Sequence, residues 1–120
     1  MIEEHTFPVE CRIRRGSDFQ RAYQSRQRVS DGRILLFGIR NELGISRIGL
    51  SVSRKHGNAV ERNRRKRLLR EAFRLTRSRL PAGYDFILIP QQGVEPVLAE
   101  YQKSLLWLAN KLDQKYGAKT

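Results

Sequence analysis

The sequence predicts an α+β fold in which helices pack on a small mixed sheet. Two observations lead to this prediction. Apolar residues recur at helical spacing in three segments, and short apolar runs bounded by turn residues lie between those segments. The 120 residues are expected to form one domain, 1–120, with the element order helix, strand, strand, helix, strand, helix.

The chain is expected to begin with an irregular arm over residues 1–10, followed by a short basic segment over residues 11–15. Ser17 and Gln20 then match the spacing of a capping box, in which two side chains satisfy backbone N–H groups at the start of a helix. The first helix is therefore expected over about residues 18–26.

Two strands are expected after this helix, with residues 29–32 as a plain connection. Residues 33–40 read as a strand with apolar side chains on both sides, and residues 46–53 read as a second strand with Ile48, Leu50 and Val52 on one side. The segment between them, 41–44, contains residues typical of turns. Because the link is short, we expect the two strands to pair with each other as an antiparallel hairpin.

The next helix carries most of the positive charge. Eleven basic residues lie between positions 54 and 79, against only two acidic ones, Glu61 and Glu71. At about 100° per residue, one face is apolar or small. It consists of Leu68, Leu69, Ala72, Phe73, Leu75 and Thr76. Asn58 is expected to cap the start, and the proline after Leu80 is expected to end the helix there.

The opposite face of this helix is cationic. It contains Asn63, Arg64, Lys66, Arg67, Arg70 and Arg74, with Arg62 at its border. Arg65 points toward the apolar side instead, so its stem is expected to lie across the core edge with its charged end in water. Since the helix offers few acidic partners, a nucleic-acid surface is favoured over a merely solvated face. The free N–H groups at the helix start also suit phosphate.

A last strand and a last helix complete the chain. Residues 84–90 form a continuous apolar run, which predicts a central strand buried on both faces. Pro96 suits the first turn of a helix, which is expected to run to about Lys115.

Composition limits the classes of function. The chain has 24 basic and 12 acidic residues and a net charge of +12, which indicates an anionic partner. No apolar run is long enough to span a membrane and no signal peptide is recognisable, so we expect neither a membrane partner nor secretion. The single cysteine, Cys11, suits a reducing compartment, so a cytoplasmic location is expected.

The residue types needed for protein-based catalysis are not grouped in the sequence. The two histidines and Cys11 lack the spacing of metal ligands, and the aspartates are scattered along the chain. No Ser/His/Asp or Cys/His arrangement stands out. We therefore expect a binding protein with no catalytic side chain and no metal site of its own.

Three aromatic residues, Phe19, Tyr23 and Phe37, have two interpretations. They can be ordinary core residues, or they can form a platform on which single-stranded bases stack. In the second interpretation the flanking arginines are Arg12, Arg14 and Arg15. Phe19 and Tyr23 are four residues apart and so share one helix face. The residues alone leave both interpretations open.

Three consecutive motifs join a strand, a turn and the basic helix. They are Gly49-Leu50-Ser51-Val52-Ser53-Arg54-Lys55, then Gly57-Asn58-Ala59-Val60, then Arg62-Asn63-Arg64 with Lys66-Arg67. Together they resemble the signature of the bacterial ribonuclease P protein component. Asp18-Phe19-Gln20 with Tyr23 resembles the first helix of that family. The resemblance covers nearly the whole chain and is weakest in the first ten residues and after Tyr116.

The resemblance implies a fold of order α-β-β-(β)-α-β-α, with a short extra strand allowed. It also implies a left-handed β-α-β crossover through the basic helix, although general rules favour a right-handed one. The implied function is that of the protein subunit of ribonuclease P. In that complex the catalytic RNA subunit uses Mg²⁺ to cleave the 5′ leader from precursor tRNA, while the protein binds the leader in a cleft and stabilises the assembly.

The resemblance also assigns residues to the two RNA partners. Contacts with the catalytic RNA are expected at Arg62, Asn63, Arg64, Lys66, Arg67 and Arg70. Contacts with the precursor-tRNA leader are expected at Phe19, Tyr23, Phe37, Arg12, Arg15 and Lys55. Arg65 departs from the apolar residue common at its position. Two alternatives are a ribosomal or other structural RNA-binding protein, which would share the charge and size, and a protein-only nuclease, which would need an acidic metal cluster.

Overall fold

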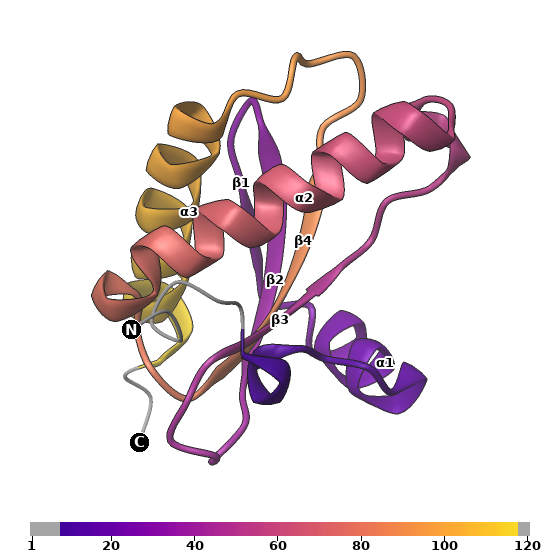
Figure 1. Ribbon diagram of the computed structural model, residues 1–120. Coiled ribbons are helices and arrows are strands. Elements are labelled where there is room, and N and C mark those ends of the chain that lie inside the picture. The colour runs from indigo at the N-terminus through magenta and orange to yellow at the C-terminus, as the bar shows by residue number, and fades with distance from the viewer. Residues whose placement is uncertain (1–7, 118–120) are drawn as a thin grey trace.

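A computed structural model describes residues 8–117 as a four-stranded sheet with helices on both of its faces (Figure 1). The helices are α1 (Gly16–Ser25), α2 (Ala59–Thr76) and α3 (Leu98–Leu112). The strands are β1 (Arg28–Ser30), β2 (Ile34–Arg40), β3 (Arg47–Leu50) and β4 (Tyr84–Pro90). The predicted α+β class is thus confirmed, and residues 1–7 of the expected N-terminal arm lie outside the described part.

The strand order is β1-β2-β4-β3, so the predicted hairpin between the second and third strands is wrong. β4 lies between them, antiparallel to β2 and parallel to β3. The physical reason is burial. β4 is apolar at nearly every position and buried along almost its whole length, so it is most stable with a partner strand on each edge. Its register with β2 extends over seven pairs, which outweighs the short link between β2 and β3.

The hairpin that does form joins β1 and β2, where a plain connection over residues 29–32 was expected. The Asp31 carboxylate accepts the N–H groups of Arg33 and Ile34 at 2.8 and 2.9 Å, which closes the turn. Val29 is buried on the inner side of β1. This short strand is the extra one that the family resemblance allowed.

The connection from β3 through α2 to β4 joins two neighbouring parallel strands. In Figure 1 both strands run upward, α2 crosses in front of the sheet, and the upper part of β4 lies to the left of the chain that leaves β3. This arrangement is left-handed, as the resemblance implied.

The predicted N-terminal cap of α2 forms, whereas the predicted cap of α1 does not. At α2, the Asn58 side chain accepts the N–H of Glu61 at 2.9 Å and the Glu61 carboxylate accepts the N–H of Asn58 at 2.8 Å, which confirms the predicted cap. The predicted Ser17 capping box does not form, because α1 already begins at Gly16 with Arg15 as its N-cap. α2 continues as a single 3-10 turn, Arg77–Arg79, before the chain extends at Leu80.

The last helix starts later than predicted and changes from α to π geometry near its predicted end. It begins at Leu98, with Val97 as its N-cap and Pro96 just outside, and it ends at Leu112 in a π-helical turn, Asp113–Gly117. None of the helices in the described part is both long and apolar enough to cross a membrane.

The two faces of the sheet are covered to different extents. On one face α2 and α3 enclose the large core, in which side chains such as Leu36, Phe73 and Leu105 are fully buried. On the other face the short α1 covers only a small cluster around Ala22 and Ile87. The aromatic residues at the edge of that small cluster remain half-buried, and the candidate site lies there.

Candidate nucleic-acid interface

The structure brings the three predicted stacking residues together. Phe19 and Tyr23 project from α1, and their ring centroids are 6.5 Å apart. Phe37 comes from β2, and its ring meets that of Tyr23 edge-on at 5.1 Å. All three side chains are half-buried, so they are neither ordinary core residues nor free surface residues. Partly exposed, mutually supported rings of this kind offer surfaces on which planar groups can stack.

A hollow of about 540 Å³ adjoins two of these rings, and it is lined by Tyr23 and Phe37 together with Arg26 and Arg28. The guanidinium carbon of Arg28 lies 6.0 Å from the Phe37 ring centroid, since the two residues are paired across β1 and β2. Sequence reasoning missed both arginines. The sequence signal for Arg28 is the polar–apolar–polar alternation Arg28-Val29-Ser30, which is typical of a short strand.

A second, smaller hollow of about 160 Å³ connects α1 with α2. Its polar lining consists of Arg12, Lys66 and Arg70. The remaining lining residues are Ile13, Phe19, Ile48, Gly49 and Leu50. Arg12 belongs to the predicted leader-binding set, whereas Lys66 and Arg70 belong to the predicted catalytic-RNA set. The structure therefore makes the two predicted surfaces continuous.

Gly49 fixes the position of Phe19 in this hollow. A Cβ atom at Gly49 would lie 2.6 Å from the Phe19 Cζ atom, so the ring packs directly on the backbone of β3. Only glycine leaves room for this contact. The glycine of the strand motif thus has a steric role in building the aromatic surface.

The same hollow concentrates positive charge. Burial lowers the pKa of Arg70 from its ordinary value, and the neighbouring charge of Arg12 lowers it further. Within residues 8–117, neither Lys66 nor Arg70 forms an ion pair with an acidic side chain. Like charges held close together beside an aromatic ring favour the binding of an anion, because the anion relieves their repulsion.

The outward face of α2 presents the rest of the predicted catalytic-RNA set. Asn63 and Arg67 are exposed, and the Arg62 Nε donates to the Asn58 carbonyl at 3.4 Å. Arg64 is exposed but pairs with Glu95 at 3.0 Å, in the loop before α3. The cationic face is therefore partly neutralised at one position by a residue that helical periodicity could not reveal.

The expectation that the charged end of Arg65 lies in water is wrong. Its side chain is half-buried, and its guanidinium donates to the carbonyls of His56 and Val94 at 3.1 and 3.2 Å. Its Nε is buried and has no hydrogen-bond partner among the described residues. Arg65 thus ties α2 to the turn before it and to the loop after β4, because those carbonyls face the helix.

The two remaining predicted leader-binding residues lie outside both hollows. Arg15 is the exposed N-cap of α1, and Lys55 is exposed in the 3-10 turn Arg54–His56 that precedes α2. The residues that line the hollows do not include them. Their assignment to the leader stays a prediction.

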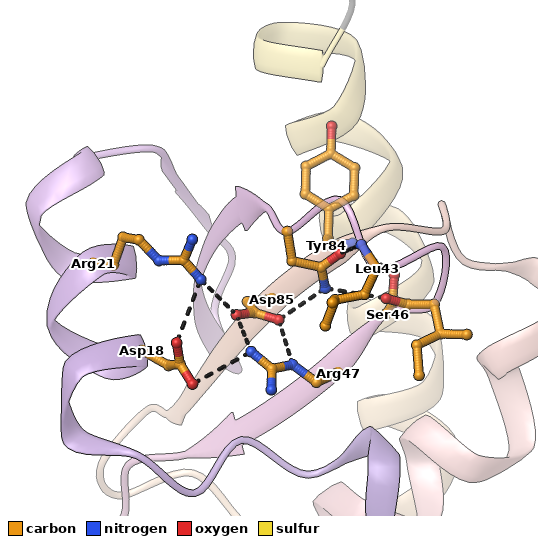
Figure 2. Close-up of polar contacts among 9 residues, drawn as sticks. Asp18, Arg21, Leu43, Ser46, Arg47, Tyr84 and Asp85 are labelled. Carbon is orange, nitrogen blue, oxygen red and sulfur yellow. Dashed lines mark hydrogen bonds and ion pairs between the residues drawn. The ribbon is translucent and has the colours of Figure 1, made fainter.

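A buried charge cluster that the sequence did not reveal anchors α1 to the sheet (Figure 2). The Asp85 carboxylate on β4 is fully buried and binds Arg47 of β3 and, at 3.3 Å, Arg21 of α1. Arg47 also pairs with Asp18 of α1 at 3.4 Å. The only signal in the sequence was an acidic residue within an apolar strand. Because two residues of α1 take part, the cluster holds the helix that carries Phe19 and Tyr23.

Asp18 and Asp85, the acidic side chains of this cluster, thus form ion pairs with arginines. In the described range 8–117, no three His, Cys, Asp or Glu side chains lie close enough together to hold a metal ion. The arrangement can bind anions and planar rings.

Comparisons with known proteins agree on one family. The family model described as Ribonuclease P matches residues 7–113. The chain is 44% identical over 91 residues to the ribonuclease P protein component of Edwardsiella ictaluri, covering 75% of this chain and 76% of that one. It is 34% identical over 102 residues to that of Pelotomaculum thermopropionicum, covering 84% and 91%.

Solved structures give the same result. The chain is similar to the Staphylococcus aureus RNase P protein, with a TM-score of 0.74 and 34% identity, covering 84% of this chain and 94% of that one. It is also similar to the RNase P protein from Thermotoga maritima, with a TM-score of 0.74 and 28% identity, covering 83% and 96%.

Proposed function

This chain belongs to the ribonuclease P protein family, and on that premise we propose how its surface serves the complex: one continuous site binds the precursor-tRNA leader and the catalytic RNA. As a protein component of ribonuclease P, the chain is a subunit of a ribonuclease that matures the 5′ end of tRNA. The comparisons give no support to the alternative of a ribosomal or other structural RNA-binding protein.

The observation that carries the proposal is the continuity of two unlike surfaces. Half-buried aromatic rings between α1 and β2, flanked by Arg26 and Arg28, suit the bases and backbone of a single strand. The hollow formed by Arg12, Lys66 and Arg70 joins them to the cationic face of α2. A strand that leaves the catalytic RNA at α2 would therefore meet Phe19 in this hollow and then Tyr23, whose ring lies beside that of Phe19.

We assign the chemistry to the RNA subunit and not to a protein side chain. The reaction requires Mg²⁺, and we place the ligands of that ion on the RNA. The absence of a three-residue group of metal-binding side chains among the described residues supports this division, as does the engagement of Asp18 and Asp85 by arginines. The protein would then act by positioning the leader and by screening phosphate repulsion between the two RNAs.

We place this activity in the cytoplasm, with the catalytic RNA and precursor tRNA as partners and no membrane partner. The single cysteine, Cys11, is buried, and burial raises the pKa of its thiol, so it stays an unreactive thiol in a reducing compartment.

Reconstitution tests the proposal directly. At low Mg²⁺, the purified chain should restore precursor-tRNA cleavage to the catalytic RNA, and the chain without RNA should not cleave. Tyr23→Ala should weaken binding of tRNA that carries a leader and barely change binding of mature tRNA. The matched control, Tyr23→Phe, keeps the ring and should keep the leader preference. Equal losses for both tRNAs, or robust cleavage by the protein alone, would overturn the proposal.

A further inference from the structure

The outer face of α3 carries an exposed tryptophan that the proposed function does not use. Trp107 is 54% exposed and is the single tryptophan of the sequence. It lies in a groove of about 650 Å³ along the helix. The described residues that line this groove are Lys103, Leu106, Trp107, Asn110, Lys111 and Gln114. A ligand that covered this side chain would bury a large aromatic surface, which is favourable, so the indole is a candidate contact surface.

This groove is separate from the surface proposed for the leader. α3 packs on the sheet face that holds the large core, through buried residues such as Leu105 and Leu108. α1 and the stacking aromatics cover the opposite face of the sheet. Figure 1 shows α3 and α1 on different sides of the strands. A ligand at Trp107 therefore cannot be the part of the RNA that lies on Tyr23.

The chemistry of the groove defines its partner. Lys103 and Lys111 lie four residues before and after Trp107, so both point along the same helix face. The Lys111 ammonium lies 4.6 Å from the centroid of the indole ring. None of the described lining residues is acidic. The groove thus offers one flat aromatic surface between two cations, which matches a planar base attached to phosphates.

We propose that Trp107, Lys103 and Lys111 form a second RNA-binding surface, on which an unpaired nucleobase stacks against the indole while the lysines contact its phosphates. Stacking of a base on an aromatic ring is stronger than a cation–π contact at an exposed site, so a base can displace the Lys111 ammonium toward a phosphate. In the complex this surface would hold a single-stranded segment on the side of the protein away from the leader.

A second copy of the chain suits this groove less well. Stable protein interfaces bury roughly 800 Å² on each partner and have an apolar centre. Here the apolar part of the lining consists of Trp107 and the half-buried Leu106, and cations flank it on both sides. Two copies that met through this face would bring like charges together.

Tryptophan fluorescence tests the proposal on the 120-residue chain, because the emission reports on Trp107 alone. Titration with a short single-stranded oligouridylate should quench the emission saturably. The double substitution Lys103→Ala and Lys111→Ala should raise the oligouridylate concentration needed for half-maximal quenching several-fold. The matched control is Lys115→Ala, which removes a similar charge from the turn after α3 and should change it little. A second measurement uses variants that also carry Tyr23→Ala, which removes the leader site. In this background, the affinity for labelled oligouridylate, measured by fluorescence anisotropy, should fall about fivefold or more with Trp107→Ala and less with Trp107→Phe.

Three results would overturn the proposal. The first is unchanged emission at oligouridylate concentrations that saturate binding. The second is equal quenching by inorganic polyphosphate, which has charge but no bases. The third is a change of emission with protein concentration in the absence of RNA, which would assign the face to a second copy. Tyr23→Ala should leave the quenching intact, so failure of the leader site and failure of this surface are distinguishable.

Discussion

Asp85 and Arg47, which face each other on the parallel strands β4 and β3, form a buried ion pair with two hydrogen bonds, 2.8 Å from Nε and 2.6 Å from Nη2. The Asn41 amide donates to the same carboxylate at 2.9 Å, and Arg21 donates at 3.3 Å. The hydrogen bond to Asp85 raises the pKa of Arg47. A carboxylate with no exposed surface is tolerated because each oxygen has charged or polar donors.

We expect Asp85→Ala to lower the free energy of unfolding by about 3 kcal/mol, because it leaves the Arg47 guanidinium largely buried without its main partner. Asp18→Ala, which removes a longer contact at a more exposed position, should cost less than about 1 kcal/mol. Urea denaturation of both variants measures the difference. Similar losses in the two variants would show that burial of the carboxylate is not decisive.

Gly49→Ala should push the Phe19 ring away from β3, since the new Cβ would lie 2.6 Å from its Cζ atom. We expect a loss of about 1–3 kcal/mol in stability, as for other overpacked sites, and weaker binding of leader-bearing tRNA. Gly32→Ala is the matched control, because no atom lies within 4 Å of its added Cβ. Thermal unfolding and affinity for leader-bearing tRNA are measured for both variants. If Gly49→Ala changes neither quantity more than Gly32→Ala does, Gly49 does not hold the Phe19 ring in place.

Arg26→Ala and Arg28→Ala should each weaken binding of leader-bearing tRNA while leaving mature tRNA nearly unaffected, because both arginines line the hollow beside Tyr23 and Phe37. For a single strand, each lost phosphate contact lowers the slope of log affinity against log salt by about 0.7. Arg79→Ala, in the 3-10 turn after α2, serves as the charge-matched control. A leader preference that survives both substitutions would contradict the role given to this hollow.

On α2, Arg67→Ala should reduce the salt dependence of catalytic-RNA binding more than Arg64→Ala does. Arg64 already pairs with Glu95, so its charge is partly neutralised before RNA binds, whereas Arg67 is exposed and unpaired within the described residues. Binding measured at several salt concentrations gives both slopes. Equal slopes would mean that the Glu95 contact is already broken in solution.

Asp31 links stability to pH. Burial raises its pKa, but hydrogen bonds from Ser104 and from the N–H groups of Arg33 and Ile34 outweigh that effect, so the pKa lies below its ordinary value. A carboxyl whose pKa is lowered by folding stabilises the fold above its unfolded pKa, about 3.9, and loses this contribution as pH falls through the folded value. Asp31→Asn should therefore be less stable than the parent at pH 7, with a gap that narrows below about pH 4. Melting curves across this range check it, and a constant gap would contradict it.

Local sequence determined the helices and the charged face. The periodicity of α2 and its Asn58 cap depend on residues within a few positions of one another, and the structure confirms both, except that Leu75 of the predicted apolar face is exposed. The motif from Gly49 to Arg67 likewise indicated the family correctly, because its strand, turn and helix are continuous in the chain. The assignment of individual residues to the two RNAs stays a prediction that the experiments above address.

Only the tertiary structure decided which strands pair. Any strand can bond to any other through its backbone, so the sequence favoured the short link between β2 and β3, whereas burial of the apolar β4 placed it between them. The same long-range packing turned the Arg65 guanidinium onto the Val94 carbonyl and enclosed Asp85 among arginines. Each of these contacts joins residues distant in the chain, where local periodicity carries no information and the burial of apolar surface selects the partner.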